Sequence, residues 1–203
     1  MSPSSAPRSA TAGRIADSLI EIAVLRGMDA VSVRSVADRA EVSIGAVQHH
    51  FPTKRHMLSA AMERVSELVH LEYERILAEC DDPLDALMAI LTGALADTER
   101  ARGLAIMWVQ FSMLACHDED ARAWVERTTE RTIAAVSELA TAKYPHLDRM
   151  RERVQTLLGL VGGFTVQSAS RWNPPGTPVV DLLKHAIHAL LVEPATKGLK
   201  AQA

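Results

Sequence analysis

The sequence is poor in cysteine, in aromatic residues and in long apolar runs, and each shortage excludes a class of protein. Its two cysteines, Cys80 and Cys116, have no metal-ligand spacing, so we expect buried, reduced thiols in a cytoplasmic protein. Aromatic residues make up only 4% of the chain and β-branched runs are scarce, which argues against a β fold. The apolar run 157–166 is shorter than the ~18 residues of a membrane span. Residues 1–10 lack the apolar core of a secretory signal.

The net charge is only −3, so no overall positive field draws the chain to nucleic acid. The charges are nevertheless unevenly placed. Residues 1–60 hold seven Lys and Arg against five acidic residues, whereas the remainder holds 15 basic against 20 acidic residues. This distribution indicates a small, mildly basic N-terminal part followed by a larger acidic part.

Alanine, leucine, arginine and glutamate dominate, and the blocks between prolines show helical periodicity, so we predict an all-α protein. The expected helices cover 15–27, 33–40, 44–50, 54–80, 84–99, 103–116, 118–144, 147–172 and 177–191. Ser32 and Thr53 are expected N-caps, and Asp82-Pro83 places a cap and a first-turn proline before the fifth helix.

Two short helices flank Glu41-Val42-Ser43, which is the arrangement of a helix-turn-helix. The residues spaced to lock the two helices together, with Phe51 closing the far side, are Val36, Ala37, Val42 and Val47. The second helix then presents Gly45, Ala46, Gln48 and His49 on its outer face. Small residues there let a helix enter a DNA major groove about 12 Å wide, and Ser43 caps the helix.

The run from 33 to 54, VRSVADRAEVSIGAVQHHFPTK, resembles the TetR family of transcriptional regulators, and the resemblance extends upstream to Ile15. Two positions depart from the family pattern. Glu41 stands where the family usually has glycine, so the turn must accept a Cβ atom. Gln48 stands where the family usually has tyrosine, and it can donate to phosphate or read adenine.

The resemblance implies an N-terminal three-helix helix-turn-helix domain joined by a long helix to a C-terminal helical bundle. It implies a flexible arm at 1–10, a DNA-binding domain at 11–57, and a ligand-binding and dimerisation domain at 58–203. The DNA contacts it implies are Ser32, Arg34, Ser43, Ile44, Gly45, Ala46, Gln48, His49, Thr53 and Lys54. Arg8 and Arg14 in the lead-in would reach the minor groove.

A methionine-rich, aromatic segment in the second part is similar to the ligand domain of betaine-type regulators in this family. The residues expected to line an effector pocket are Met107, Trp108, Gln110, Phe111, Met113, Leu114, Phe164 and Gln167. An ordinary hydrophobic core accounts for the same segment equally well, and both interpretations stay open here.

The stretch 157–166 is apolar on every side, and the last helix carries an apolar stripe. We therefore expect a homodimer with a four-helix interface that includes Leu158, Val161, Leu183, Ile187 and Leu190. The alternative is a long helix buried inside one chain.

Taken with the resemblance, these features predict a ligand-responsive regulator. It would repress by binding a palindromic operator duplex as a dimer, until a small apolar or amphipathic effector releases it. No catalytic motif is present, and neighbouring histidines such as His49 and His50 diverge on a helix, so we expect no enzyme, metal site or cofactor. The alternatives are a helical ligand-binding or enzymatic protein with a vestigial helix-turn-helix, and an effector-independent DNA-binding protein.

Overall fold

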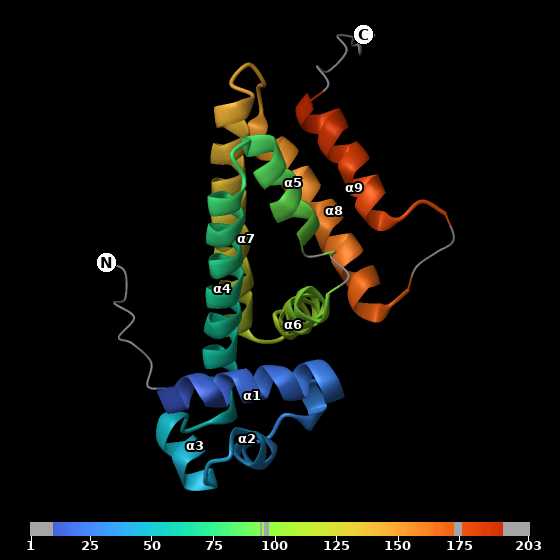
Figure 1. Cartoon of the computed structure of the whole chain (residues 1–203). Coiled ribbons are helices and arrows are strands. Elements are labelled where there is room, and N and C mark those ends of the chain that lie inside the picture. Colours follow the sequence, from blue (N-terminus) through green and yellow to red (C-terminus); the bar gives the residue numbers. More distant parts are fainter. Residues whose placement is uncertain (1–9, 94, 96–97, 173–175, 193–203) are drawn as a thin grey trace. The chain divides into compact units, whose positions relative to one another are not determined.

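The computed structural model describes residues 10–93, 95, 98–172 and 176–192, and every regular element in these ranges is helical (Figure 1). The elements are α1 (Ala10–Arg26), η1 (Met28–Ala30), α2 (Val33–Ala40), α3 (Ile44–His50), α4 (Lys54–Glu79), α5 (Pro83–Gly93), α6 (Glu99–Leu114), α7 (Glu119–Lys143), α8 (Met150–Ser170), α9 (Val179–Ile187) and a π-helical turn, η2 (His188–Val192). The predicted all-α class is confirmed. The arm at 1–9, including Arg8, lies outside the described residues.

The helix starts follow the expected capping chemistry. The Ser32 hydroxyl accepts from the Ser35 amide at 3.1 Å, and the Asp82 carboxylate accepts from the Leu84 amide at 2.7 Å. The Thr53 hydroxyl accepts from the His56 amide at 3.3 Å. Each side chain satisfies an amide that has no partner inside its own helix, so these caps fix where α2, α4 and α5 begin.

Several predicted boundaries are wrong: α1 begins at Ala10 rather than Ile15, α8 begins at Met150 rather than Leu147, and the limits of the fifth and sixth helices differ as well. The helix expected at 84–99 ends at Gly93, and the next begins at Glu99 rather than Gly103. The cause is Thr98, whose hydroxyl accepts from the Ala101 amide at 3.1 Å and so caps α6 earlier than we expected. A threonine directly before a glutamate was the available signal, and apolar periodicity alone missed it.

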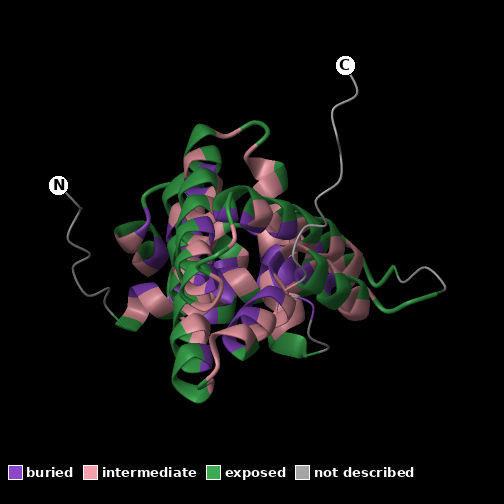
Figure 2. Cartoon of the chain, turned by 90° about the horizontal axis from the view of Figure 1, so that it is seen from above, coloured by how far each residue is buried: buried purple, intermediate pink, exposed green. Residues whose placement is uncertain are grey.

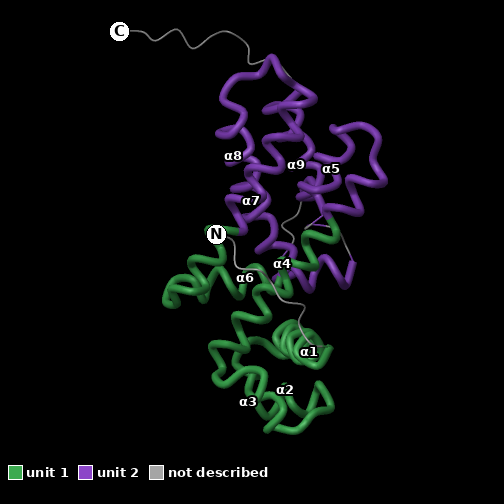
Figure 3. Tube along the Cα trace, turned by 90° about the vertical axis from the view of Figure 1, so that its left-hand side faces the viewer, with its two compact units in different colours: residues 1–72, 106–127 green, residues 73–105, 128–203 purple. Residues whose placement is uncertain are grey.

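By packing, the chain divides into two compact units (Figure 3). Unit 1 comprises the chain up to Glu72 together with Ile106–Arg127, and unit 2 comprises Tyr73–Ala105 and the chain from Thr128 onward. Helices α4, α6 and α7 each contribute to both units. The functional boundary expected at 57/58 stays a prediction, because it concerns roles rather than packing.

Unit 1 has its first core where α1, α2 and α3 meet. Ile15, Leu19, Val36 and Val47 are all fully buried there. Figure 2 shows how buried positions alternate with exposed ones along the helices. Arg64 on α4 donates to Asp17 on α1 at 2.7 Å, so an ion pair also fastens the first helix to the fourth. Packing against α1 and α2 therefore holds α3 in a fixed orientation, so that its outer side chains keep fixed positions.

The second core of unit 1 is aromatic. Trp124 on α7 lies 5.3 Å from the Phe111 ring in an edge-to-face arrangement and 5.8 Å from the Trp108 ring on α6. Its indole N–H donates to the Ser66 hydroxyl on α4 at 2.9 Å. Because a buried indole needs such a partner, this bond fixes α7 against α4 within the unit.

Unit 2 is built around one apolar cluster drawn from α4, α5, α7, α8, α9 and η2. Leu87, Leu157, Leu183 and Ile187 are fully buried in it. A further bond joins Lys143 at the end of α7 to Asp82 before α5 at 2.7 Å. None of the helices in the described ranges is both long and apolar enough to span a bilayer.

Candidate nucleic-acid interface

The third helix has one buried side and one exposed side. Val47 is fully buried against the rest of unit 1, whereas Gly45, Gln48 and His49 are exposed and Ile44 keeps 46% of its surface open. The Ser43 hydroxyl accepts from the Ala46 amide at 3.0 Å, so Ser43 is the predicted cap. The helix therefore offers a short, capped, mostly uncharged face to a partner outside the chain.

Gly45 lies at the centre of this face, and its missing side chain is not required by the fold. A Cβ atom built there meets only the Ser43 hydroxyl, at the ordinary contact distance of 3.8 Å. Glycine in a helix costs about 1 kcal/mol relative to alanine. Since nothing in the part of the chain that the structure describes requires the glycine, the open space is available for the close approach of another molecule.

Two further helix starts carry predicted contact residues. Ser32 caps α2, with Arg34 exposed in its first turn, and Thr53 caps α4, with Lys54 as the first residue of that helix. Helix N-termini carry partial positive charge and favour phosphate. The predicted DNA residues are thus contributed by α3, with its cap, and by the starts of α2 and α4, all within unit 1.

The turn before α3 accepts a side chain, as the sequence required. Glu41 caps the end of α2 in the left-handed region, with φ of 55°, and its amide donates to the Ala37 carbonyl. A residue other than glycine at such an angle costs about 1–2 kcal/mol. The helix-turn-helix therefore forms despite this departure from the family pattern.

The cations of this region fall into two groups. Arg39 is paired with Glu21 at 2.5 Å, and Arg55 is paired with Asp120 at 2.6 Å. The hydrogen bond from Arg55 holds the pKa of the Asp120 carboxyl below its usual value. Arg34 and Lys54, by contrast, have no acidic partner among the described residues, so their charges are available to an external anion. Arg14 is exposed on α1.

The predicted effector residues are divided between the two units. Those on α6 belong to unit 1, where Met107 and Phe111 are fully buried while Met113 is 64% exposed. Phe164 and Gln167 belong to unit 2. The Gln167 side-chain oxygen is buried and has no hydrogen-bond partner among the described residues. The pocket itself stays a prediction.

The predicted dimer residues are more deeply placed than expected. Leu183 and Ile187 are fully buried inside their own chain, and Leu158, Val161 and Leu190 pack against the same cluster. This burial accounts for the apolar character of Leu183 and Ile187 within one chain, and a subunit interface that includes the five residues stays a prediction. The exposed side of α8 is instead made of other residues, among them Gly159, Gly163 and Val166.

Three comparisons with known proteins, by family, by sequence and by structure, agree with one another. Residues 15–61 match the family described as bacterial regulatory proteins, tetR family. The HTH-type transcriptional regulator BetI of Burkholderia cenocepacia is 28% identical over 167 residues, which cover 82% of this chain and 86% of that protein. A transcriptional regulator from Rhodococcus sp. Rha1 has a similar structure, with a TM-score of 0.75 and 26% identity over 89% of this chain and 93% of that one.

A more distant structure shares the fold. It is a regulator from Saccharomonospora viridis solved in complex with choline, with a TM-score of 0.76 and 19% identity, covering 88% of this chain and 94% of the other.

Proposed function

Because the chain belongs to the TetR family of transcriptional regulators, we propose that it is a repressor that holds a palindromic operator as a homodimer and is released by a small effector. The observation that carries the DNA-binding part is the outer face of α3. Its capped start and the space at Gly45 fit a major groove, while Val47 fixes the helix from behind.

The exposed face of α8 supports the dimer. A Cβ atom added at Gly159, Gly162 or Gly163 meets no atom within 4 Å, so packing inside the described chain requires none of these glycines. Val166 and Leu160 are partly exposed beside them. A second copy packed closely on this face would bury them and account for the glycines. A two-fold symmetric dimer would read two half-sites whose centres lie one DNA turn, ~34 Å, or a multiple of it apart.

Unpaired polar atoms support an effector site in unit 2. The buried atoms without a hydrogen-bond partner among the described residues are Arg102 Nε, Ser137 Oγ and Gln167 Oε1, contributed by α6, α7 and α8. Buried polar groups are almost always bonded to protein, water or ligand. A small molecule with both apolar and polar parts would satisfy such groups, and the Saccharomonospora viridis regulator, which shares this fold, was solved in complex with choline.

The substitutions Gln48→Ala and Lys54→Ala distinguish base recognition from phosphate contact. Lys54→Ala should weaken binding to every duplex and reduce the salt dependence, because the proposal places the Lys54 ammonium group, at the start of α4, against phosphate, which is the same in every sequence. Gln48→Ala should cost ~1–3 kcal/mol and relax the preference at one base pair of each half-site, if the exposed amide reads a base. Fluorescence anisotropy on a series of operator duplexes with single base-pair changes measures both effects.

The unmodified protein provides the decisive comparison in that series. Affinity that ignores both base sequence and palindromy would contradict the repressor proposal as a whole. Equal weakening of all duplexes by Gln48→Ala would leave the proposal standing and assign Gln48 to phosphate.

The substitution Gln167→Leu tests the proposed effector site in unit 2. We expect Gln167→Leu to raise the effector concentration needed for half-maximal release of DNA about tenfold. This change corresponds to one lost hydrogen bond of ~1.4 kcal/mol. Affinity for the operator without effector should not change, because Gln167 lies outside unit 1. Release is followed by anisotropy, with choline and betaine as the first compounds tested. If the variant merely melts at a higher temperature and releases DNA normally, Gln167 is an ordinary core residue.

A further inference from the structure

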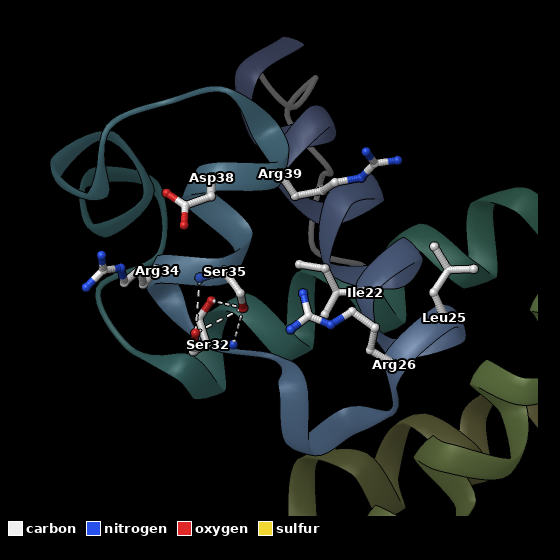
Figure 4. Close-up of a pocket in the computed structure, with 8 residues that line it drawn as sticks. All are labelled: Ile22, Leu25, Arg26, Ser32, Arg34, Ser35, Asp38 and Arg39. Atoms are coloured by element: carbon white, nitrogen blue, oxygen red, sulfur yellow. Dashed lines mark hydrogen bonds between the residues drawn. The ribbon is translucent and has the colours of Figure 1, made fainter.

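An open groove runs between the end of α1 and the outer side of α2, and the DNA residues predicted from the sequence explain only part of it (Figure 4). Its volume is about 610 Å³. It is lined by Ile22, Leu25, Arg26, Ser32, Arg34, Ser35, Asp38 and Arg39. All of these belong to unit 1, so the groove is a feature of the helix-turn-helix support itself.

The arginines that line the groove differ in whether an acidic side chain neutralises their charge. Arg39 is bonded to Glu21, but Arg26 and Arg34 have no acidic partner among the described residues. In Figure 4 the Arg26 side chain reaches from α1 toward Ser32 and Ser35 at the start of α2, and Arg34 lies on the other side of Ser32. Two uncompensated guanidinium groups therefore flank one helix N-terminus, which itself carries partial positive charge.

The shape of the groove favours an extended anion over a small one. Leu25 on its rim is 74% exposed, so the walls do not enclose a small molecule on most sides, as ligand pockets normally do. The groove also includes Ser32 and Arg34, which the sequence analysis predicts as DNA contacts. A phosphodiester strand matches both the charge and the open form, and deoxyribose rings can contact the Leu25 methyl groups.

We propose that this groove receives the DNA backbone that flanks each half-site, and that Arg26 is a phosphate-contacting residue beyond the helix-turn-helix contacts. This inference rests on the proposed function and extends it to a longer footprint. Arg26 would not contribute to sequence specificity, because it would contact phosphate and no base. It would add affinity on any sequence, provided that the duplex extends beyond the half-site.

The test compares Arg26→Gln with the unmodified protein on two duplexes, one ending at the outer base pair of each half-site and one extended by about half a DNA turn, ~5 base pairs, on both sides. On the extended duplex we expect the variant to bind about five- to tenfold more weakly at low salt. The slope of log affinity against log salt should fall by about two, or ~0.9 for each of two released counterions per dimer. On the short duplex the two proteins should be nearly equal.

Two controls accompany this comparison. Arg26→Lys keeps the charge and should restore most of the slope, whereas Arg131→Gln removes an exposed arginine from unit 2 and should leave the slope unchanged. An unchanged slope in Arg26→Gln on the extended duplex overturns the inference. Specific binding by the unmodified protein tests the proposed function separately.

Discussion

A leucine in place of Gly45 should abolish specific operator binding while leaving the protein folded and slightly more stable. The Cβ atom of the new side chain meets only the Ser43 hydroxyl at 3.8 Å, so the chain itself accepts it. Replacing a helical glycine with leucine also gains about 0.5–1 kcal/mol of helix propensity. The same side chain projects from the exposed face of α3, where a DNA base edge would otherwise approach the backbone.

The expected loss is at least 100-fold in operator affinity, or about 2.7 kcal/mol or more per complex, since the whole helix must withdraw from the groove. Binding is measured by anisotropy and stability by thermal unfolding. Gly93→Leu is the matched control: Gly93 ends α5, and a Cβ atom there meets no atom of the described residues within 4 Å. That variant should gain stability and bind normally. Normal operator binding by Gly45→Leu would show that α3 does not enter the groove.

The features that could be predicted from sequence were those fixed by local chemistry. Ser32, Ser43 and Thr53 cap helices where the sequence placed them, because a hydroxyl before an apolar-periodic run satisfies amides only in that position. The buried role of Val47 followed from its spacing relative to Val36. Such signals lie within a few residues of one another and need no knowledge of the remaining fold.

The features that escaped prediction depend on contacts distant in sequence. Nothing local shows that Leu183 and Ile187 are covered by their own chain rather than by a partner, because an apolar stripe is the same in both cases. Arg26, which we propose as a phosphate contact, was not predicted, for a different reason. It lies outside the 33–54 run, and only the packing of α1 against α2 brings it to the groove beside Ser32.

The burial of Ile187 changes how the dimer must be tested. A charge at Ile187 would enter the core of unit 2 unpaired and unfold it, and loss of the dimer would then reveal nothing about the interface. Gly163 on α8 is the better position, because it is exposed and a Cβ atom there meets no atom within 4 Å. Gly159 precedes it by one helical turn and Val166 follows it by about one, on the same face.

Gly163→Glu should convert the dimer into folded monomers. If two copies of α8 pack closely through this face, the new side chain both prevents the approach and places like charges on the two sides of a symmetric contact. A weakening of dimerisation by at least 100-fold is the expected result, equivalent to about 2.7 kcal/mol. Sedimentation equilibrium measures the association, and circular dichroism should show unchanged helix content.

Operator affinity should fall together with dimerisation, because a monomer contacts only one half-site, whereas a dimer holds its second subunit close to the second half-site. Gly93→Glu introduces the same side chain at another open glycine of unit 2 and should remain dimeric. A folded Gly163→Glu protein that stays dimeric at micromolar concentration would remove this face of α8 from the interface. Weak operator binding in a variant that is still dimeric would point instead to an altered spacing of the two α3 helices, a result that separates assembly from DNA recognition.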